Sequence, residues 1–239
     1  MIISCTKGIN EKPLMTMSET IEKHFNNSSI KVGVLSGPNL AREIADEKVA
    51  GTVIASKHAD LSHLGREILS SSTFKIYTST DTQGIELAGA LKNIYAIISG
   101  YCHSLDVGEN AIGLILTRSM AEMSNFAVSK GANPITFLGL AGMGDLVATC
   151  FSKLSRNYQF GWAIGEGLDI EAAKNKVGQV AEGLNTIKII HSEISSSEIK
   201  MPLVSGMHEI LFNNGSKELL LEQIINSEIY VDVNFDVES

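Results

Sequence analysis

Apolar residues follow two different periods along the chain, and the first part has the period of strands. There, short β-branched or alternating runs separate amphipathic stretches, a pattern that predicts strands between helices. The expected strands are residues 1–5, 30–35, 49–55 and 74–78. The expected helices between them are residues 13–25, 40–45 and 59–70. Strands that alternate with helices predict an α/β layer over residues 1–80.

From residue 81 onward the period is helical almost throughout. We expect helices at residues 84–100, 110–130, 135–140, 146–150, 155–162, 170–176, 181–194, 203–212 and 217–225. Residues 230–239 alternate and are acidic, which fits either a loose strand or disorder. The sequence therefore predicts an α/β domain at residues 1–80 and an all-α domain at residues 81–239.

The predicted helix at 84–100 is apolar or small on nearly every side, and Thr80 with Gln83 is expected to cap its start. A helix of this kind is buried, so Lys92 is expected inside the protein with small residues one turn before and after it. Burial lowers the pKa of a lysine, which can make it a base near neutral pH. Taken alone, this stretch also allows Lys92 to reach past its short neighbours to solvent.

Composition narrows the function classes. The net charge of −8 disfavours nucleic acid as a general partner, because phosphate binding over a broad surface needs basic clusters, but a locally basic pocket can still bind a small anion. Cys5, Cys102 and Cys150 lack metal-ligand spacing and indicate a reduced compartment. With no metal motif, secretion signal or bilayer-spanning run, we expect a soluble cytoplasmic protein without membrane insertion.

The glycine-rich loop of dinucleotide-binding folds is absent from these 239 residues. No Gly-x-Gly-x-x-Gly follows an opening strand. A doubly wound sheet begins with that strand, turn and helix. We therefore expect residues 1–80 to be the later part of such a sheet.

Polar groups gather at four places that have turn or helix-start chemistry, namely residues 6–8, 36–39, 145–149 and 155–157. Asp145 is expected to N-cap the helix after it, with Thr149 one turn later on the same face. Ser155 is expected to cap the next helix, whose start forms an anion site with Arg156 and Asn157. Each place alone fits an ordinary turn or cap. Together with the buried lysine they supply cations, a carboxylate and backbone donors.

The ordered motifs carry a family resemblance. They are Thr6-Lys7-Gly8, Ser36-Gly37-Pro38-Asn39, Gly89-Ala90-Leu91-Lys92-Asn93, Gly142-Met143-Gly144-Asp145-Leu146, Ser155-Arg156-Asn157 and Gly178-Gln179-Val180-Ala181-Glu182-Gly183. This set resembles the bacterial NAD(P)-dependent glycerol-3-phosphate dehydrogenases up to about Leu221, without the family's opening Gly-x-Gly-x-Trp-Gly. The resemblance implies a partial Rossmann-like sheet followed by an all-α domain of the 6-phosphogluconate dehydrogenase C-terminal type.

The resemblance also implies roles for individual residues. Lys92 would accept the proton of the C2 hydroxyl of glycerol 3-phosphate, and Asp145 would steady and orient its ammonium. The substrate-binding residues would be Lys7, Gly37, Asn39, Asn93, Asp145, Thr149, Ser155, Arg156 and Asn157. The residues that bind NAD or NADP would be Lys7, Ala41, Arg156, Val180 and Glu182. Asn39 departs from the serine or threonine that the family more often has there. The residue types agree with the chemistry, since hydride transfer needs a base and the substrate phosphate needs an anion pocket.

We interpret the sequence as an oxidoreductase that interconverts sn-glycerol 3-phosphate and dihydroxyacetone phosphate with NAD(P)(H) and supplies phospholipid synthesis. A non-catalytic remnant that keeps the helical domain as a folded or partner-binding module is the alternative. The absent glycine-rich loop favours that alternative, and the intact Lys92, Asp145 and Arg156 oppose it. A related hydroxyacid dehydrogenase would also use a helical-domain lysine, but residues 155–157 speak against it. A homodimer and either cofactor stay open.

Overall fold

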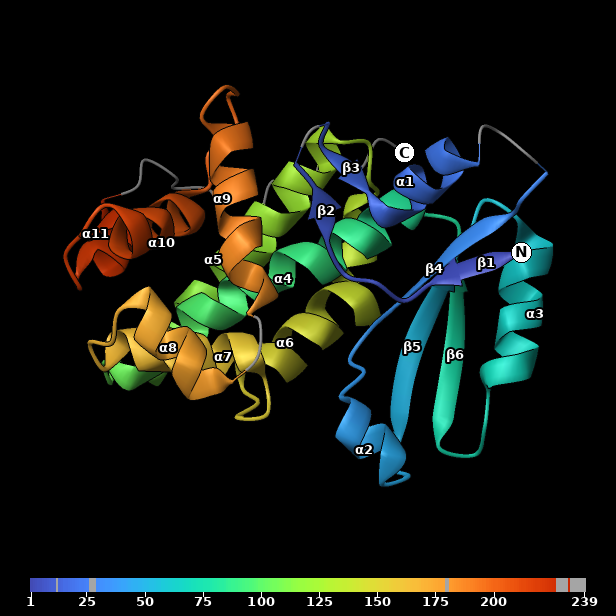
Figure 1. The fold of residues 1–239 in the computed structure, drawn as a ribbon, viewed down its shortest axis with the longest axis horizontal. Coiled ribbons are helices and arrows are strands. Elements are labelled where there is room, and N and C mark those ends of the chain that lie inside the picture. Colours follow the sequence, from blue (N-terminus) through green and yellow to red (C-terminus); the bar gives the residue numbers. More distant parts are fainter. Residues whose placement is uncertain (12, 26–28, 179–180, 227–231, 233–239) are drawn as a thin grey trace. The chain divides into compact units, whose positions relative to one another are not determined.

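Figure 1 shows a computed structural model of the chain, which describes residues 1–11, 13–25, 29–178, 181–226 and 232. The chain divides into two compact units. Unit 1 comprises Met1–Asn93 and Phe126–Thr149, and unit 2 comprises Ile94–Asn125 and Cys150–Ser239. The α/β domain expected at residues 1–80 lies wholly in unit 1, and the division of the chain at residue 80 stays a prediction.

The sheet of unit 1 has four strands in the order β1-β4-β5-β6. These strands are β1 (Ile2–Ser4), β4 (Val32–Ser36), β5 (Ala50–Ala55) and β6 (Phe74–Ser79). β1 is parallel to β4 and β5 is parallel to β6, whereas β4 and β5 are antiparallel, with Val34 opposite Ala55. All four predicted strands are confirmed, and the sheet is mixed, as large doubly wound sheets often are.

Helices cover both faces of this sheet. On one face lies α3 (Ala59–Leu69) (Figure 1). Its Leu61 packs against Ile54 and Ile76 of the strands. On the other face Val34, Val53 and Ala55 pack against apolar residues of the helical part of unit 1. Two short elements complete the first part, α2 (Ala41–Ala45) and the antiparallel pair of β2 (Ile9–Asn10) with β3 (Met15–Thr16). The sheet is therefore a buried middle layer, as the alternation of elements predicts.

Helix α1 (Met17–His24) begins later than the predicted start at residue 13. The residues before it pair in the β2–β3 hairpin instead. Thr16 then caps α1, because its side chain accepts from the backbone of Glu19 while the Glu19 carboxylate accepts from the Thr16 backbone. Hairpin pairing and this capping box together set the start of the helix.

Helix α4 (Thr82–Ser104) is the long buried helix that the pattern at 84–100 predicts. The capping box of Thr80 and Gln83 is wrong. Asp81 takes that place, since its Oδ1 accepts from the backbone nitrogen of Gly84 at 2.9 Å. Its other oxygen accepts from Asn133 N and Thr136 Oγ1. A carboxylate can hold the helix start and a second segment together, and its charge favours the helix N-terminus.

The predicted glycine turn at residues 141–145 is a turn of helix. A 3₁₀-helix, η1 (Pro134–Leu138), precedes a π-helical turn, η2 (Leu140–Gly144), which runs directly into α6 (Asp145–Cys150). Asp145 has helical dihedral angles of −75° and −32°, so its predicted role as an N-cap is wrong. The turn depends on Gly142, because a Cβ there would lie 2.2 Å from the carbonyl oxygen of Phe137. Asp145 consequently keeps its side chain for other partners.

Unit 2 is helical in its described part. Besides the end of α4 and most of α5 (Glu109–Ser129), it contains α7 (Arg156–Gly165), α8 (Ile170–Val177), α9 (Glu182–Ile194), α10 (Pro202–Phe212) and α11 (Leu219–Ile225). These confirm the predicted helices, and the ends of α5 and of α7 to α11 lie within three residues of the predicted ones. The prediction for residues 230–239 lies outside the described residues apart from Asp232. Among the described helices, none has a stretch long and apolar enough to cross a bilayer.

Candidate active site

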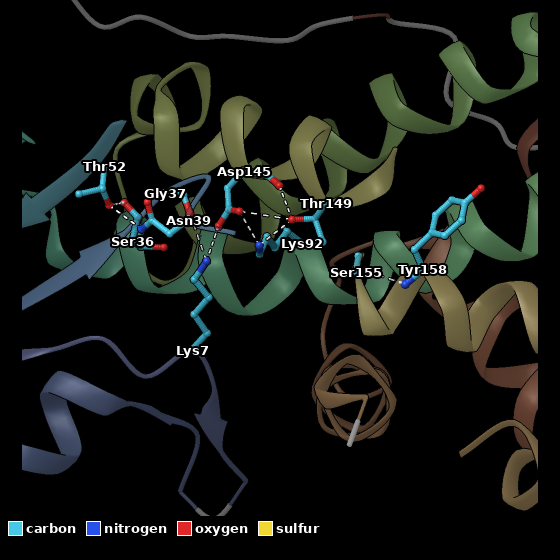
Figure 2. Close-up of polar contacts among 10 residues, drawn as sticks. All are labelled: Lys7, Ser36, Gly37, Asn39, Thr52, Lys92, Asp145, Thr149, Ser155 and Tyr158. Atoms are coloured by element: carbon cyan, nitrogen blue, oxygen red, sulfur yellow. Dashed lines mark hydrogen bonds and ion pairs between the residues drawn. The ribbon is translucent and has the colours of Figure 1, made fainter. Parts of the chain in front are cut away.

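Lys92 lies in the buried interior of unit 1, where α4 places it (Figure 2). Only 6% of the residue is exposed, so the alternative in which its side chain reaches solvent is wrong. Its ammonium donates to Asp145 Oδ1 at 2.5 Å and to Thr149 Oγ1 at 2.7 Å. The prediction of a buried lysine is confirmed, and its partners come from α6, more than fifty residues away along the chain.

Asp145 connects this lysine to a second one. The carboxylate is 1% exposed, and its Oδ2 pairs with the ammonium of Lys7 at 2.6 Å. Lys7 also donates to the carbonyl oxygen of Gly37 at 3.3 Å, at the end of β4. Figure 2 shows the two lysines approaching the carboxylate from different segments. One carboxylate thus stands between two ammonium groups, which leaves the cluster with an excess of positive charge when both lysines are protonated.

The pKa of Lys92 is lowered from 10.5 to about 8, chiefly because burial removes water from its ammonium. The negative charge of Asp145 opposes this shift, and the positive charge of Lys7 adds to it. A lysine with this pKa can be neutral or charged near physiological pH, as proton transfer requires. Burial and two charged neighbours therefore make Lys92 suited to accept and return a proton.

Thr149 fixes the relative placement of these groups. It lies one turn after Asp145 on α6, and its hydroxyl donates to the Asp145 carbonyl oxygen at 2.6 Å while it accepts from Lys92. The expectation that both residues share one helix face is confirmed, although α6 begins at Asp145 instead of after it. Thr149 and Asp145 thus hold the Lys92 ammonium together, whereas Lys7, the other lysine of the cluster, is partly exposed.

The ends of β4 and β5 supply further polar groups beside Gly37. Asn39 Nδ2 donates to Thr52 Oγ1 at 2.8 Å, and that hydroxyl donates to the Ser36 carbonyl oxygen at 3.0 Å. The side-chain oxygens of Ser36 and Asn39 are buried without a hydrogen-bond partner in the part of the chain that the structure describes. Buried polar atoms without partners are uncommon in folded proteins. They are therefore candidate contacts for the polar groups of a bound ligand.

Two further predicted residues of unit 1 lie on α2 and α4. Ala41 is exposed as the first residue of α2, and Asn93 is buried beside Lys92 in α4. Sequence reasoning missed Thr52 and Glu86. Thr52 gave no signal, because a threonine in a β-branched strand is ordinary. Glu86 had a usable signal, since a carboxylate stood in a helix predicted to be buried on nearly all sides.

The other predicted residues belong to unit 2. Ser155 caps α7 as expected, accepting from the backbone nitrogen of Tyr158 at 3.3 Å. Arg156 is exposed in the first turn of α7, and no hydrogen bond or ion pair of its side chain is found within the described ranges. Asn157 is buried, and its Oδ1 accepts from the backbone nitrogen of Gly183 at 2.9 Å, joining α7 to the start of α9. Glu182 begins α9, and Val180 lies outside the described residues.

A group of three possible metal ligands also lies in unit 2, within the described residues. His191, His208 and Glu209 offer ligand atoms within 4.8 Å of one another. The two rings stack nearly parallel with centroids 3.7 Å apart, so their in-plane lone pairs do not converge on one point. Both Glu209 oxygens already accept from Asn213 Nδ2, at 2.9 and 3.0 Å. This packing suits ring stacking and hydrogen bonding better than coordination of an ion.

The sequence of this chain is similar to proteins of one known enzyme family. The family described as NAD-dependent glycerol-3-phosphate dehydrogenase C-terminus matches residues 81–222, and its N-terminus counterpart matches residues 1–62. The glycerol-3-phosphate dehydrogenase [NAD(P)+] of Pseudomonas putida is 47% identical over 234 residues, which are 98% of this chain and 68% of that protein. The enzyme of the same name from Pseudomonas syringae pv. tomato is 48% identical over 235 residues, with the same shares covered.

Solved structures are similar as well. The crystal structure of glycerol-3-phosphate dehydrogenase from Coxiella burnetii has a TM-score of 0.86 at 32% identity, over 94% of this chain and 68% of that chain. Glycerol-3-phosphate dehydrogenase from Saccharomyces cerevisiae has a TM-score of 0.83 at 28% identity, over 93% of this chain and 67% of that chain.

Proposed function

The chain belongs to the NAD-dependent glycerol-3-phosphate dehydrogenase family, and from this premise we propose that the Lys7–Asp145–Lys92 cluster is its proton-transfer site. The reaction is the interconversion of sn-glycerol 3-phosphate and dihydroxyacetone phosphate with NAD or NADP. The observation that carries the proposal is a buried lysine whose ammonium is held by a buried carboxylate and a threonine. A non-catalytic remnant is not favoured, because burying such a charged cluster is costly unless it serves a purpose.

Lys92 is proposed to act on the C2 oxygen. In the oxidation direction its neutral amine takes the hydroxyl proton and becomes an ammonium, and in the reduction direction that ammonium returns the proton. When bound, the nicotinamide supplies the acceptor or donor of the hydride at C2. Because Asp145 and Thr149 hold the lysine nitrogen in place, little reorganisation is needed at each transfer.

Lys7 and Asp145 are proposed to balance the charge during this transfer. When Lys92 gains a proton, the adjacent carboxylate stabilises the new ammonium, as its raising effect on the Lys92 pKa indicates. Lys7 keeps the carboxylate paired when Lys92 is neutral. Its charge also favours the anionic substrate. The cluster can therefore change its protonation state without leaving a buried carboxylate unpaired.

The residues present fit a polar substrate and a nicotinamide cofactor. The unpartnered Ser36 hydroxyl and Asn39 carbonyl oxygen lie beside Gly37, whose own carbonyl oxygen binds Lys7. The proposed substrate ligands are Lys7, Gly37, Asn39, Asn93, Asp145, Thr149, Ser155, Arg156 and Asn157. The proposed dinucleotide ligands are Lys7, Ala41, Arg156, Val180 and Glu182. The exposed guanidinium of Arg156 at a helix N-terminus supports phosphate binding there.

The metabolic role, the compartment and the oligomeric state of the protein are proposed from fewer observations. We propose that the glycerol 3-phosphate feeds phospholipid synthesis and that the protein works in the cytoplasm, where thiols stay reduced. Cys5, Cys102 and Cys150 are free thiols, which supports a reducing compartment. A homodimer is proposed from the family resemblance, and sedimentation equilibrium of the purified chain would test it.

A substrate comparison tests the function. Oxidation of NADH and NADPH is followed with dihydroxyacetone phosphate, with dihydroxyacetone and with a 2-oxo acid. We use the 239-residue chain and a fusion that adds the family's Gly-x-Gly-x-Trp-Gly strand, turn and helix before Met1. We expect the fusion to turn over dihydroxyacetone phosphate, and its turnover should fall strongly when dihydroxyacetone replaces that substrate. Turnover with the 2-oxo acid but not with the phosphorylated ketone would contradict the proposal and favour a hydroxyacid dehydrogenase.

A further inference from the structure

One side of α4 holds more of the active-site architecture than the reacting lysine. Glu86, Gly89 and Lys92 are spaced three residues apart, so they follow one another along neighbouring turns of the helix. Each of them contacts, directly or through Asp145, the segment that begins with Lys7 and ends in α1. All of these residues belong to unit 1.

Glu86 holds the start of α1. Its side chain is buried, and its Oε1 accepts from the backbone nitrogen of Ser18 at 2.9 Å. Its Oε2 accepts from the Ser18 hydroxyl, which lies 3.3 Å from the hydroxyl of Thr16. A carboxyl group is favourable at a helix N-terminus, where backbone donors are otherwise unsatisfied. The first turn of α1 is thus anchored to α4 by a buried carboxyl group from outside α1.

The β2–β3 hairpin transmits this anchor to Lys7. Ile9, two residues after Lys7, pairs across the hairpin with Thr16, two residues before Ser18. Asn10 also donates to Thr20 in α1 at 2.6 Å. Hydrogen-bonded pairs fix the register of the two strands. A displacement of the start of α1 would therefore move the segment from which Lys7 extends.

Gly89 gives the Lys7 side chain its path along α4. A Cβ built on Gly89 would lie 3.6 and 3.7 Å from the Cγ and Cδ atoms of Lys7, and 2.7 Å from the Ser36 hydroxyl. The aliphatic part of Lys7 therefore lies beside the helix at a position without a side chain. Its ammonium emerges where it meets Asp145.

We propose that Glu86 is a positioning residue for the reaction: by holding the start of α1, it sets where the Lys7 ammonium meets Asp145 and thereby the charge beside Lys92. The role in turnover rests on the proposed function, whereas the effect on Lys92 does not. Glu86 itself touches neither the reacting lysine nor its carboxylate in any contact that the structure describes. Its influence passes through the hairpin and Lys7.

Direct titration of Lys92 provides a readout that does not require activity. The charged and polar groups facing its amine are Asp145, Lys7 and Thr149. Burial is the largest cause of its lowered pKa, and Lys7 also lowers it. If Lys7 swings away and admits water, both effects weaken while Asp145 remains. The pKa of Lys92 should then rise from about 8 toward the ordinary lysine value, by about one unit.

The experiment measures the Lys92 pKa by NMR of ε-¹³C-labelled lysine in the 239-residue chain, with the signal assigned through Lys92→Met. Glu86→Ala and Lys7→Met are expected to raise it by similar amounts, and the double variant should add little to either. Glu86→Gln should keep the Lys92 pKa at its wild-type value, because an amide can still accept from Ser18 N and contact the Ser18 hydroxyl. Ser18→Ala, which removes one of the two hydrogen bonds, should give a smaller rise.

Glu122→Ala is the matched control, because Glu122 is also a buried carboxyl group that accepts from a backbone nitrogen at a helix start, but in unit 2. It should leave the Lys92 pKa unchanged even where it lowers the melting temperature. A wild-type Lys92 pKa in Glu86→Ala and Ser18→Ala, or an equal shift in Glu122→Ala, would overturn the proposal. If Glu86→Ala does not fold, Ser18→Ala decides. Absence of turnover with an observed shift would count against the proposed function alone.

Discussion

Two buried carboxyl groups, Asp145 in unit 1 and Glu122 in unit 2, are stabilised in opposite ways. Asp145 in unit 1 pairs with the ammonium groups of Lys7 and Lys92. Glu122 in unit 2 has neutral partners, accepting from Leu203 N at 2.7 Å and meeting the Tyr95 hydroxyl at 3.0 Å. Burial raises the pKa of Glu122 to about 8, so it is protonated at neutral pH. A buried carboxyl group is thus not by itself a sign of an active site.

Helix α4 takes part in both arrangements. It contributes Lys92 to the charged cluster and, three residues later, Tyr95 to the neutral pair. Glu122 supplies a hydrogen-bond acceptor to the start of α10, where Met201 provides no side-chain cap. The neutral pair therefore has a structural task. The charged cluster instead keeps a lysine ready to gain and lose a proton, and the difference lies in the charge of the partners.

The largest expected effect is on turnover. Lys92→Met keeps an apolar stem of similar length but removes the base, so kcat should fall by about a hundredfold to ten-thousandfold. Tyr95→Phe is the control on the same helix, since it removes a buried hydrogen bond from the neutral pair. It should leave kcat within about twofold. A Lys92→Met enzyme that melts at a higher temperature and turns over normally would show that Lys92 is only a tolerated core residue.

Next in size is the loss of stability from Asp145→Asn. The amide leaves the buried Lys92 and the partly exposed Lys7 without a countercharge, so the free energy of unfolding should fall by about 3 kcal/mol. Urea denaturation at pH 6 measures it against Glu122→Gln. That matched variant swaps a neutral acid for a neutral amide and should cost less than about 1 kcal/mol. Equal losses in the two variants would remove the distinction between the two carboxyl groups.

Arg156→Ala should act mainly on substrate affinity. A charge-assisted contact to phosphate is worth about 2 kcal/mol, so KM for dihydroxyacetone phosphate should rise by about tenfold to a hundredfold while kcat changes less. Gln159→Ala, another exposed position on α7, is the control. Steady-state kinetics separates the two constants. A drop in kcat with unchanged KM would place Arg156 in the chemical step instead.

The smallest expected effect, taken per pH unit, concerns the pH dependence of stability. Glu122 has a folded-state pKa of about 8 against an ordinary value of 4.5. Between those values the folded state binds a proton that the unfolded state has lost, so this group makes stability fall as pH rises from about 5 to about 8. The slope is at most about 1.4 kcal/mol per pH unit. Glu122→Gln should flatten this part of the curve, and an unchanged slope would show that Glu122 ionises normally.

Local patterns predicted the elements and the burial of Lys92. Four strands alternate with helices, and the small or apolar neighbours of Lys92 place it inside α4. Ser155 caps α7 as its position before the helical period indicates. These features depend on residues a few places apart, which the sequence displays directly. The family resemblance added the pairing of Lys92 with Asp145, which periodicity alone does not contain.

Contacts between distant segments were harder to foresee. Asp145 looked like an N-cap after a glycine turn, but close packing of Gly142 on Phe137 allows a π-helical turn that carries the helix through it. Asp81 displaced Thr80 as the cap of α4, because it also binds residues of η1. Pairing of Glu86 with Ser18 likewise needs the β2–β3 hairpin. Each outcome was decided by partners that lie far away in the sequence.

The pH dependence of glycerol 3-phosphate oxidation tests whether Lys92 exchanges the reacting proton. Above about pH 7 the substrate phosphate is largely dianionic, so changes in kcat/KM there report the free enzyme. If Lys92 is the base, kcat/KM should rise with pH and level off with a midpoint near the Lys92 pKa of about 8. In Lys7→Met the midpoint should move upward together with the Lys92 pKa measured by NMR. A profile that stays flat, or a midpoint that does not follow the Lys92 titration, would contradict this role of Lys92.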